Sequence, residues 1–189
     1  FSFGDHLGSG MVLANLLRRR LRPEIEAFLA DGGLAIGICN GFQVLAKTGI
    51  LTNLRGGWER EITLVHNEKP GYVDDWVRVR VEPESPCVWT KGLSTLDLPV
   101  RHGEGRFTAR DPDTLARLES ERLVALRYEG RNPNGSANGI AGVCDRTGRV
   151  LGLMPHPEAF LIPDNHPDRR RRPPGETGLS IFRNAVERS

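Results

Sequence analysis

The chain has 189 residues, 38% of them hydrophobic, which is enough to form the core of one α/β domain and gives no reason to expect two. Its 26 basic and 24 acidic residues leave a formal net charge of +2, so we expect no general attraction to nucleic acid or to an anionic membrane. No apolar stretch is long enough to span a bilayer and no signal peptide is visible, which together predict a cytoplasmic protein.

Two helices are predicted near the start of the chain. Apolar residues recur at helical spacing over residues 11–21, and residues 23–30 resume the helical pattern before the turn at residues 31–33. We expect both helices to cover one face of a sheet.

The most informative segment of the chain is Gly37-Ile38-Cys39-Asn40-Gly41. Residues 35–38 are typical of a buried strand and residues 42–46 of the start of a helix, so a cysteine stands where the strand turns into the helix. Such a turn, a nucleophile elbow, needs glycines on both sides because larger side chains would collide. The helix N-terminus would favour the thiolate form of Cys39. A small, buried and unreactive thiol is the alternative interpretation.

The later segments complete an α/β pattern. Val77, Val79 and Val81 alternate with charged residues, as in a half-exposed strand. The order of the segments predicts a flavodoxin-like α/β fold, with a mostly parallel central sheet flanked by helices and a small antiparallel ribbon, in a single domain over residues 1–189. The other predicted segments are strands over residues 123–128, 140–144 and 150–154 and helices over residues 111–121 and 176–188.

A histidine and a carboxylate follow the strand predicted over residues 150–154. In extended backbone, residues two apart point to the same side, so His156 and Glu158 are placed to meet. With Cys39 they form a candidate catalytic triad, in which Cys39 attacks a carbonyl carbon, His156 moves the proton and Glu158 orients the imidazole. The backbone amide of Asn40, directly after the nucleophile, is the first candidate donor to the oxyanion, and a second donor must come from elsewhere.

The remaining cysteines and histidines indicate no further chemistry. The chain has three cysteines, an odd number without paired spacing, so Cys87 and Cys144 are expected to be buried and to form neither a disulfide framework nor a zinc site. The other histidines lack the spacing of metal ligands, and we expect no metal site. No phosphate-binding loop or dinucleotide fingerprint is present, so we expect the chain not to bind ATP through either motif.

Residues 169–172 are four consecutive arginines, followed by two prolines and a glycine. A charge run of this kind is typical of a solvated loop. The alternative is a contact surface for an acidic partner.

Four motifs together carry a family resemblance. They are Gly37-Ile38-Cys39-Asn40-Gly41-Phe42-Gln43, Arg101-His102-Gly103-Glu104-Gly105-Arg106, Asn132-Pro133-Asn134-Gly135-Ser136 and Met154-Pro155-His156-Pro157-Glu158. With these motifs the chain resembles, over essentially its whole length, the glutaminase of phosphoribosylformylglycinamidine synthase. That glutaminase is a class I glutamine amidotransferase of purine biosynthesis, which occurs as a separate small subunit or as the C-terminal domain of a long synthase.

The resemblance implies roles for single residues. It makes Cys39 the nucleophile and His156 and Glu158 the other members of the triad. Gln43 would help to hold the substrate, L-glutamine, and a polar residue on the helix surface is the alternative. His102 lies in a family signature near the site and is a candidate substrate contact, with a hydrogen-bonded structural histidine as the alternative.

The resemblance also predicts that a first βα unit is missing. In the family, the segment that corresponds to Phe1-Ser2-Phe3-Gly4-Asp5 follows a strand, a helix and a further strand, which ends in a Gly-Gly loop that supplies the second oxyanion donor. Here the sequence opens at Phe1 without an initiator methionine. We expect an omitted N-terminal segment rather than a truncated, inactive form.

The function implied by the resemblance is glutamine hydrolysis. Ammonia would pass through a tunnel to a synthetase subunit or domain of the same enzyme, where ATP and Mg²⁺ support the conversion of formylglycinamide ribonucleotide to its amidine. The resemblance allows a small third subunit and places no cofactor in this chain. The alternatives are another triad glutamine amidotransferase, a related cysteine hydrolase, or a non-catalytic truncated regulatory or binding subunit.

Overall fold

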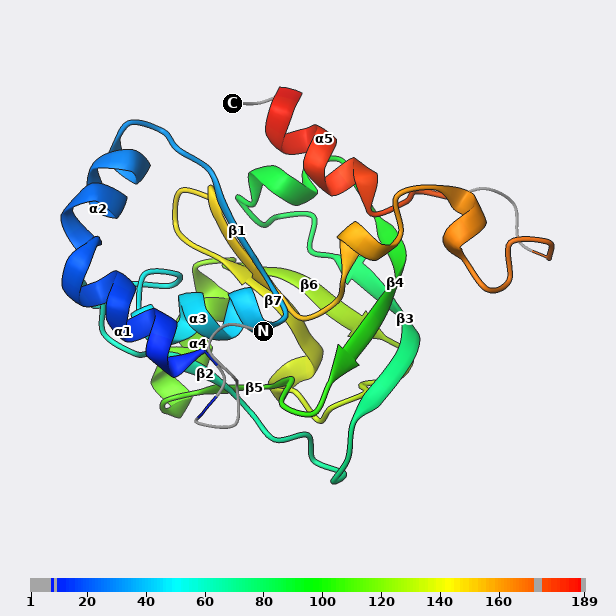
Figure 1. Cartoon of the computed structure of the whole chain (residues 1–189), viewed down its shortest axis with the longest axis horizontal. Coiled ribbons are helices and arrows are strands. Elements are labelled where there is room, and N and C mark those ends of the chain that lie inside the picture. The colour runs from blue at the N-terminus through cyan, green and yellow to red at the C-terminus, as the bar shows by residue number, and fades with distance from the viewer. Residues whose placement is uncertain (1–7, 9, 172–174, 188–189) are drawn as a thin grey trace.

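The computed structural model describes residues 8, 10–171 and 175–187 (Figure 1). The opening segment Phe1-Ser2-Phe3-Gly4-Asp5, which contributes to the family resemblance, lies outside the described residues, and so does Arg172 of the arginine run. Within the described part of the chain, no helix is both long and apolar enough to cross a membrane.

Six strands form the main sheet, and two more form a separate antiparallel ribbon. The main sheet has the order β1-β8-β7-β6-β3-β4, and the ribbon pairs β2 with β5. Their bounds are β1 (Ala35–Ile38), β2 (Ile62–Val65), β3 (Val73–Val81), β4 (Thr95–His102), β5 (Arg106–Ala109), β6 (Val124–Glu129), β7 (Ile140–Cys144) and β8 (Val150–Leu153).

The α/β class and the small ribbon are confirmed, but the expectation of a mostly parallel sheet needs correction. Among the described strands, only β1 and β8 pair in parallel, and the other neighbouring pairs of the main sheet are antiparallel. The short connection explains this for β7 and β8, because a parallel pair needs a crossover of a dozen or more residues. Only residues 145–149 join β7 to β8, in a turn closed by the Asp145 side chain, which accepts hydrogen bonds from Thr147 Oγ1 and Val150 N.

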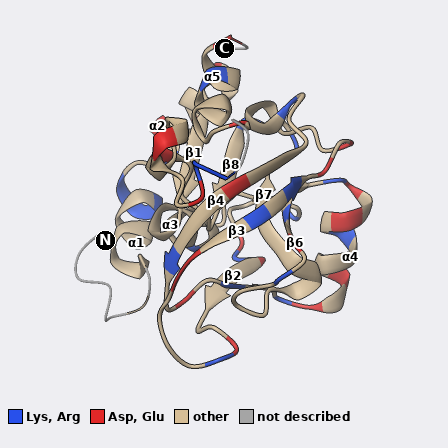
Figure 2. Ribbon diagram, turned by 90° about the vertical axis from the view of Figure 1, so that its right-hand side faces the viewer, with Lys and Arg blue, Asp and Glu red and all other residues tan. Residues whose placement is uncertain are grey.

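Sequence periodicity missed β2, β4 and β5. β4 contains Pro99, which cannot donate a hydrogen bond to a neighbouring strand, and it lies at the edge of the sheet, where proline is tolerated. Its partner is β3, and the two strands are joined by a two-point ion pair in which Arg78 Nε and Nη2 donate to Asp97 at 3.0 Å each. Basic and acidic segments are interspersed along these two strands (Figure 2), with no single sign of charge dominating them.

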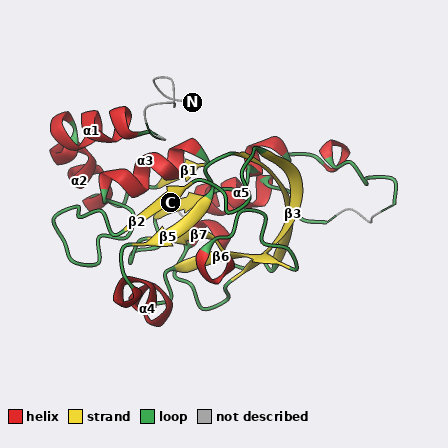
Figure 3. Cartoon of the chain, turned by 90° about the horizontal axis from the view of Figure 1, so that it is seen from below, coloured by secondary structure: helices red, strands yellow, loops and turns green. Residues whose placement is uncertain are grey.

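The packing of the first helix differs from the prediction that it covers one face of the sheet. The helices are α1 (Met11–Arg20), α2 (Arg22–Ala30), α3 (Asn40–Thr48), α4 (Pro112–Ser120) and α5 (Leu179–Glu187). α3 packs on β1 and β8, whereas α1 packs on α3 rather than on the strands (Figures 1 and 3). The approach is close, because a Cβ at Gly10 would stand 2.4 Å from Val44 of α3. α1 therefore reaches the sheet through α3, whereas Leu29 of α2 packs against the core cluster that contains Val150 of β8.

The hydrophobic core lies on both faces of the main sheet. β7 and β8 are buried along their whole length. Successive residues of a strand point to opposite faces. Accordingly, Leu151 and Leu153 share a cluster with Ile181 of α5, whereas Val150 shares the other cluster with Phe42 of α3. Burial on both sides fixes β8, and with it the position of the residues that follow it.

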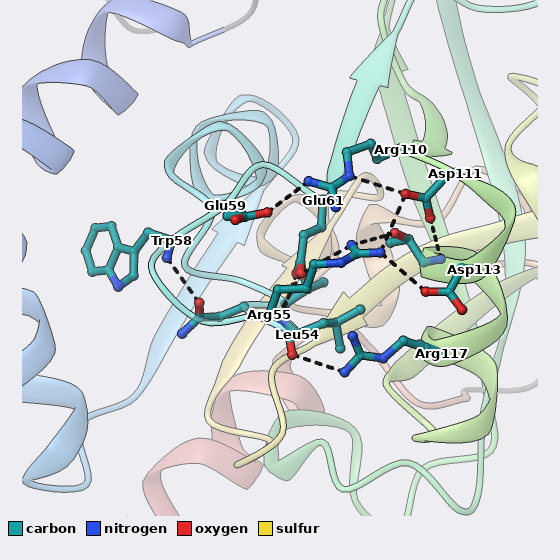
Figure 4. A network of polar contacts seen from close by, with 12 residues as sticks. Leu54, Arg55, Trp58, Glu59, Glu61, Arg110, Asp111, Asp113 and Arg117 are labelled. Atoms are coloured by element: carbon teal, nitrogen blue, oxygen red, sulfur yellow. Dashed lines mark hydrogen bonds and ion pairs between the residues drawn. The ribbon is translucent and has the colours of Figure 1, made fainter.

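A buried carboxylate, Glu61, organises the loop after α3 (Figure 4). Its side chain is fully buried and accepts hydrogen bonds from Thr52 Oγ1 at 2.9 Å, Leu54 N at 2.7 Å and Arg55 N at 2.9 Å. The guanidinium of Arg55 lies 3.7 Å from the same carboxylate and continues to Asp113 on α4. These partners offset the cost of burying the charge, and they connect the loop to α4.

Replacement of Glu61 by alanine should lower the free energy of unfolding by about 3 kcal/mol, because two backbone amides, a buried hydroxyl and one arginine lose their acceptor. The matched control is Glu59→Ala, which removes an exposed ion pair with Arg110 and should cost less than about 1 kcal/mol. Urea unfolding of both variants measures the difference. Equal losses would show that the Glu61 network contributes no more than a surface pair.

Candidate active site

The two candidate catalytic segments emerge side by side because β1 and β8 are parallel neighbours. In the register of this pair, Ile38 lies opposite Leu153, so Cys39 and the residues after β8 leave the sheet at the same edge. The amide of Cys39 also donates to the carbonyl of Leu153 at 2.8 Å. The structure thus brings Cys39 and the His156 segment together at two strand ends, and their catalytic roles stay a prediction.

The backbone at Cys39 has the shape of a nucleophile elbow. Its φ of 51° and ψ of −105° lie outside the regions that a residue with a side chain normally adopts, and α3 begins at the next residue. Such a conformation costs about 1–3 kcal/mol, which the surrounding fold must supply. A Cβ at Gly37 would stand 2.6 Å from the Gly41 carbonyl oxygen, so glycine is required there. At Gly41 the described residues leave open space, so the collision expected on that side is absent.

The side chains of His156 and Glu158 are hydrogen-bonded to each other. The Nδ1 atom of His156 lies 2.6 Å from Oε1 of Glu158, and the backbone amide of His156 donates to the carbonyl of Pro99 on β4 at 2.8 Å. Burial raises the pKa of the Glu158 carboxyl, but the hydrogen bond from His156 and the nearby charge of Arg101 outweigh it, and the pKa is lowered overall. Glu158 is therefore ionised at neutral pH.

Protonation of His156 is favoured by the two groups on either side of its ring. Burial alone would lower its pKa, but the interactions with Cys39 and Glu158 outweigh burial and raise the pKa to about 9. The buried Nε2 atom makes no hydrogen bond of normal geometry with any described residue. The imidazole is thus charged at neutral pH, with a carboxylate at Nδ1 and the cysteine as its other electrostatic partner.

Asn40 and Gln43 lie on the first turn of α3, beside Cys39. Asn40 is the first residue of the helix, so its backbone amide lies at the helix N-terminus, directly after the candidate nucleophile. Its side chain donates to Gln43 Oε1 at 3.0 Å, and Gln43 Nε2 donates to the carbonyl of Glu104 at 2.6 Å. Gln43 is 4% exposed, so the alternative of a residue on the helix surface is wrong. Its contact with the substrate stays a prediction.

His102, at the end of β4, is buried and neutral at physiological pH. Burial lowers its pKa to about 4, and the nearby charge of His156 acts in the same direction. Its Nε2 atom lies 3.5 Å from Nδ2 of Asn134, and its Nδ1 atom has no hydrogen-bond partner among the described residues. The histidine is therefore not a second proton carrier near pH 7, and its contact with the substrate stays a prediction.

Two contacts at the site carry no signal in the sequence. The Sγ atom of Cys39 lies 3.7 Å from the backbone carbonyl oxygen of Arg101, so this carbonyl faces the candidate nucleophile. Asn67, in the loop between β2 and β3, is buried and hydrogen-bonded to the backbone of the segment that follows Arg101. Neither a backbone carbonyl nor a single loop asparagine forms a recognisable pattern.

Other residues singled out in the sequence lie away from this site. Cys87 and Cys144 are buried free thiols, as expected. In the part of the chain that the structure describes, no group of three or more His, Cys, Asp or Glu side chains is arranged to hold a metal ion. Residues 169–171 of the arginine run are exposed, in accord with a solvated loop.

Removal of the Glu158 charge should lower the pKa of His156 from about 9 towards its ordinary value of 6.5. The protonated ring stabilises the folded chain fully below pH 6.5, and this contribution is lost as the pH rises through about 9. Glu158→Gln should therefore show a smaller loss of stability over this pH range than the wild type. An NMR titration of the His156 ring, with Asp164→Asn as a control for an exposed carboxylate, measures the shift. An unchanged pKa in Glu158→Gln would contradict the assigned pairing.

Comparison with known proteins agrees with this geometry. The model of the CobB/CobQ-like glutamine amidotransferase domain matches residues 1–187. Phosphoribosylformylglycinamidine synthase subunit PurQ of Dehalococcoides mccartyi is 42% identical over 99% of this chain and 76% of the relative, and that of Methanococcus maripaludis is 39% identical over 99% and 78%.

A solved structure is also similar to this chain over nearly its whole length. The structure of PurLQS from Thermotoga maritima matches with a TM-score of 0.73 and 30% sequence identity, over 99% of this chain and 75% of that chain. The chain therefore belongs to the CobB/CobQ-like glutamine amidotransferase family, in the branch that contains the PurQ subunits of phosphoribosylformylglycinamidine synthase.

Proposed function

We propose that the chain is the glutamine-hydrolysing component of phosphoribosylformylglycinamidine synthase and that Cys39, His156 and Glu158 are its catalytic triad. The observation that carries the proposal is the strained cysteine of the elbow beside a charged histidine, which is itself bonded to a carboxylate. The names of the relatives support the assembly, because these proteins are subunits of that synthase, and the glutamine amidotransferase family supports glutamine as the substrate.

In the first half of the reaction, the thiolate of Cys39 attacks the carboxamide carbon of glutamine. The imidazolium of His156 donates its Nε2 proton to the amide nitrogen, the C–N bond breaks, and ammonia leaves. A thioester between Cys39 and the glutamyl group remains. The raised pKa of His156 suits this step, because the ring holds the proton at neutral pH until the leaving group takes it.

In the second half, the now neutral His156 removes a proton from water as the water attacks the thioester. Glutamate is released, and the thiolate of Cys39 and the imidazolium of His156 are restored. Glu158 keeps the ring oriented with Nδ1 towards its carboxylate and Nε2 towards the reacting atoms.

The negative oxygen formed in both halves lies near the start of α3. The backbone amide of Asn40 is the first donor to it, and the positive end of the helix dipole acts in the same direction. Gln43 and His102 are proposed to contact the glutamine.

The product ammonia is used by a synthetase subunit or domain of the same enzyme. There, ATP and Mg²⁺ would support the replacement of an oxygen of formylglycinamide ribonucleotide by nitrogen, and a small third subunit is compatible with this assembly. The chain itself would hold no cofactor. Because ammonia is the only species exchanged, the site of glutamine hydrolysis and the site of synthesis can be tested separately.

Cys39→Ala should abolish amidine synthesis from glutamine and leave synthesis from free ammonium salts within about twofold of the wild type, because only the source of nitrogen is lost. Both rates are measured on the complex with the synthetase. Cys144→Ala, which removes a buried thiol outside the site, should retain glutamine-dependent synthesis. Glutamine use by Cys39→Ala would exclude Cys39 as the nucleophile, and loss of both activities would point to a failure of assembly.

A further inference from the structure

The segment of residues 102–105, which leads from the end of β4 into β5, has every backbone carbonyl occupied. The carbonyls of His102 and Gly103 accept hydrogen bonds from the side chain and the backbone of Asn67, both at 3.0 Å. The carbonyl of Glu104 accepts from Gln43, and that of Gly105 accepts from Asn134 Nδ2 at 2.8 Å. A loop held at four consecutive carbonyls is fixed in one conformation.

Asn67 makes more of these contacts than any other described residue. It is 6% exposed. Its Oδ1 accepts from the amide of Gly105 at 3.0 Å, while its Nδ2 donates to the carbonyls of His102 at 3.0 Å and Gly71 at 3.2 Å. The side chain therefore uses its acceptor and its donors together, and its backbone amide binds Gly103. A side-chain amide offers a hydrogen-bond acceptor and two donors on one planar group.

The 102–105 segment forms part of the wall of the active site. Arg101, directly before it, supplies the carbonyl that faces Sγ of Cys39. The imidazole of His102 packs on the segment itself, because a Cβ at Gly105 would stand 2.5 Å from the ring. Gln43, one turn after Cys39, is bonded to Glu104. A shift of the segment would therefore move the Arg101 carbonyl and the Gln43 side chain relative to Cys39.

We propose that Asn67 is a positioning residue of the glutaminase, which acts by holding the 102–105 segment in the one conformation that places the Arg101 carbonyl, His102 and the Gln43 side chain around Cys39. The inference rests on the proposed function, since it concerns the site of the same reaction. Asn67 does not touch Cys39, His156 or Glu158 through any hydrogen bond of the described structure, so its effect passes through the segment.

Asn67→Ala removes three side-chain hydrogen bonds and leaves the amide of Gly105 without its acceptor. A misplacement of catalytic groups by about 1 Å can cost up to about a hundredfold in rate, so we expect kcat/KM for glutamine to fall by at least about tenfold. Synthesis from free ammonium salts by the same complex should be unchanged, because that reaction does not use Cys39.

The matched control is Asn184→Ala. The Nδ2 atom of Asn184 also bridges two backbone carbonyls, those of Trp89 at 3.0 Å and Lys91 at 2.9 Å, in a part of the fold that contains no candidate catalytic residue. This variant loses the same kind of interaction and should keep kcat/KM within about twofold of the wild type.

A second variant tests the acceptor oxygen of the Asn67 side chain separately from its donor nitrogen. Asn67→Asp keeps an oxygen for the amide of Gly105 but replaces the donor to the carbonyl of His102 with a repelling oxygen. If Asn67→Ala does not fold, Asn67→Asp answers the same question. We expect kcat/KM to fall by at least about fivefold in Asn67→Asp, because repulsion at the His102 carbonyl displaces the segment although Gly105 keeps an acceptor.

Hydrogen exchange measures the position of the segment without reference to activity. In the complex, exchange of the Gly105 amide should be at least about tenfold faster in Asn67→Ala than in the wild type, and unchanged in Asn184→Ala. The proposal is overturned if Asn67→Ala and Asn67→Asp both keep kcat/KM within about twofold of the wild type, or if Asn184→Ala loses as much activity as they do.

The failure of this inference differs from the failure of the proposed function. If the wild type and Cys39→Ala consumed glutamine at the same rate, the proposed function would be wrong, whereas the exchange data would still decide whether Asn67 orders the segment. If Cys39→Ala is inactive with glutamine and Asn67→Ala is fully active, the function stands and the role of Asn67 is rejected.

Discussion

The parallel pairing of β1 with β8 is the constraint on which the site depends. It is the one parallel pair among the described strands, and its register sets Cys39 beside the segment that carries His156. The surrounding antiparallel strands and the double-sided core hold β8 in place, and β4 fixes the His156 backbone through the carbonyl of Pro99. The catalytic geometry is therefore a property of the whole sheet, although only three side chains would perform the chemistry.

The electrostatics of the site follow from this placement. Burial alone would leave His156 neutral, as it leaves His102 neutral with a pKa of about 4. The difference between the two histidines lies in their partners, since His156 interacts with a carboxylate at 2.6 Å and with Cys39, and its pKa is raised to about 9. One imidazole is thus charged at neutral pH, whereas the other is neutral.

Much of this account could be predicted from the sequence because local signals were strong. The elbow at Cys39 and the spacing of His156 and Glu158 are short patterns with a direct geometric meaning, and the strands predicted around residues 140–154 agree with β7 and β8 within one residue. The prediction of a mostly parallel sheet was wrong, because the order and direction in which strands pair depend on tertiary contacts. β4 was missed because Pro99 resembles a break when the position of the strand in the sheet is unknown.

The role of Asn67 could not have been predicted in this way. Its three side-chain hydrogen bonds reach backbone atoms up to 38 residues away, and no spacing or composition encodes them. The same holds for the carbonyl of Arg101, because backbone atoms carry no sequence identity. Such residues become visible only when the fold brings a segment and its supports together.

The most direct test of the central claim is peptide mass spectrometry after treatment of the complex with a diazo-ketone analogue of glutamine. The account predicts covalent modification of Cys39, protection by glutamine, and loss of modification in His156→Ala, because the reagent must enter a formed glutamine site and meet an activated thiol. Absence of modification at Cys39, or modification that glutamine does not prevent, would contradict the account.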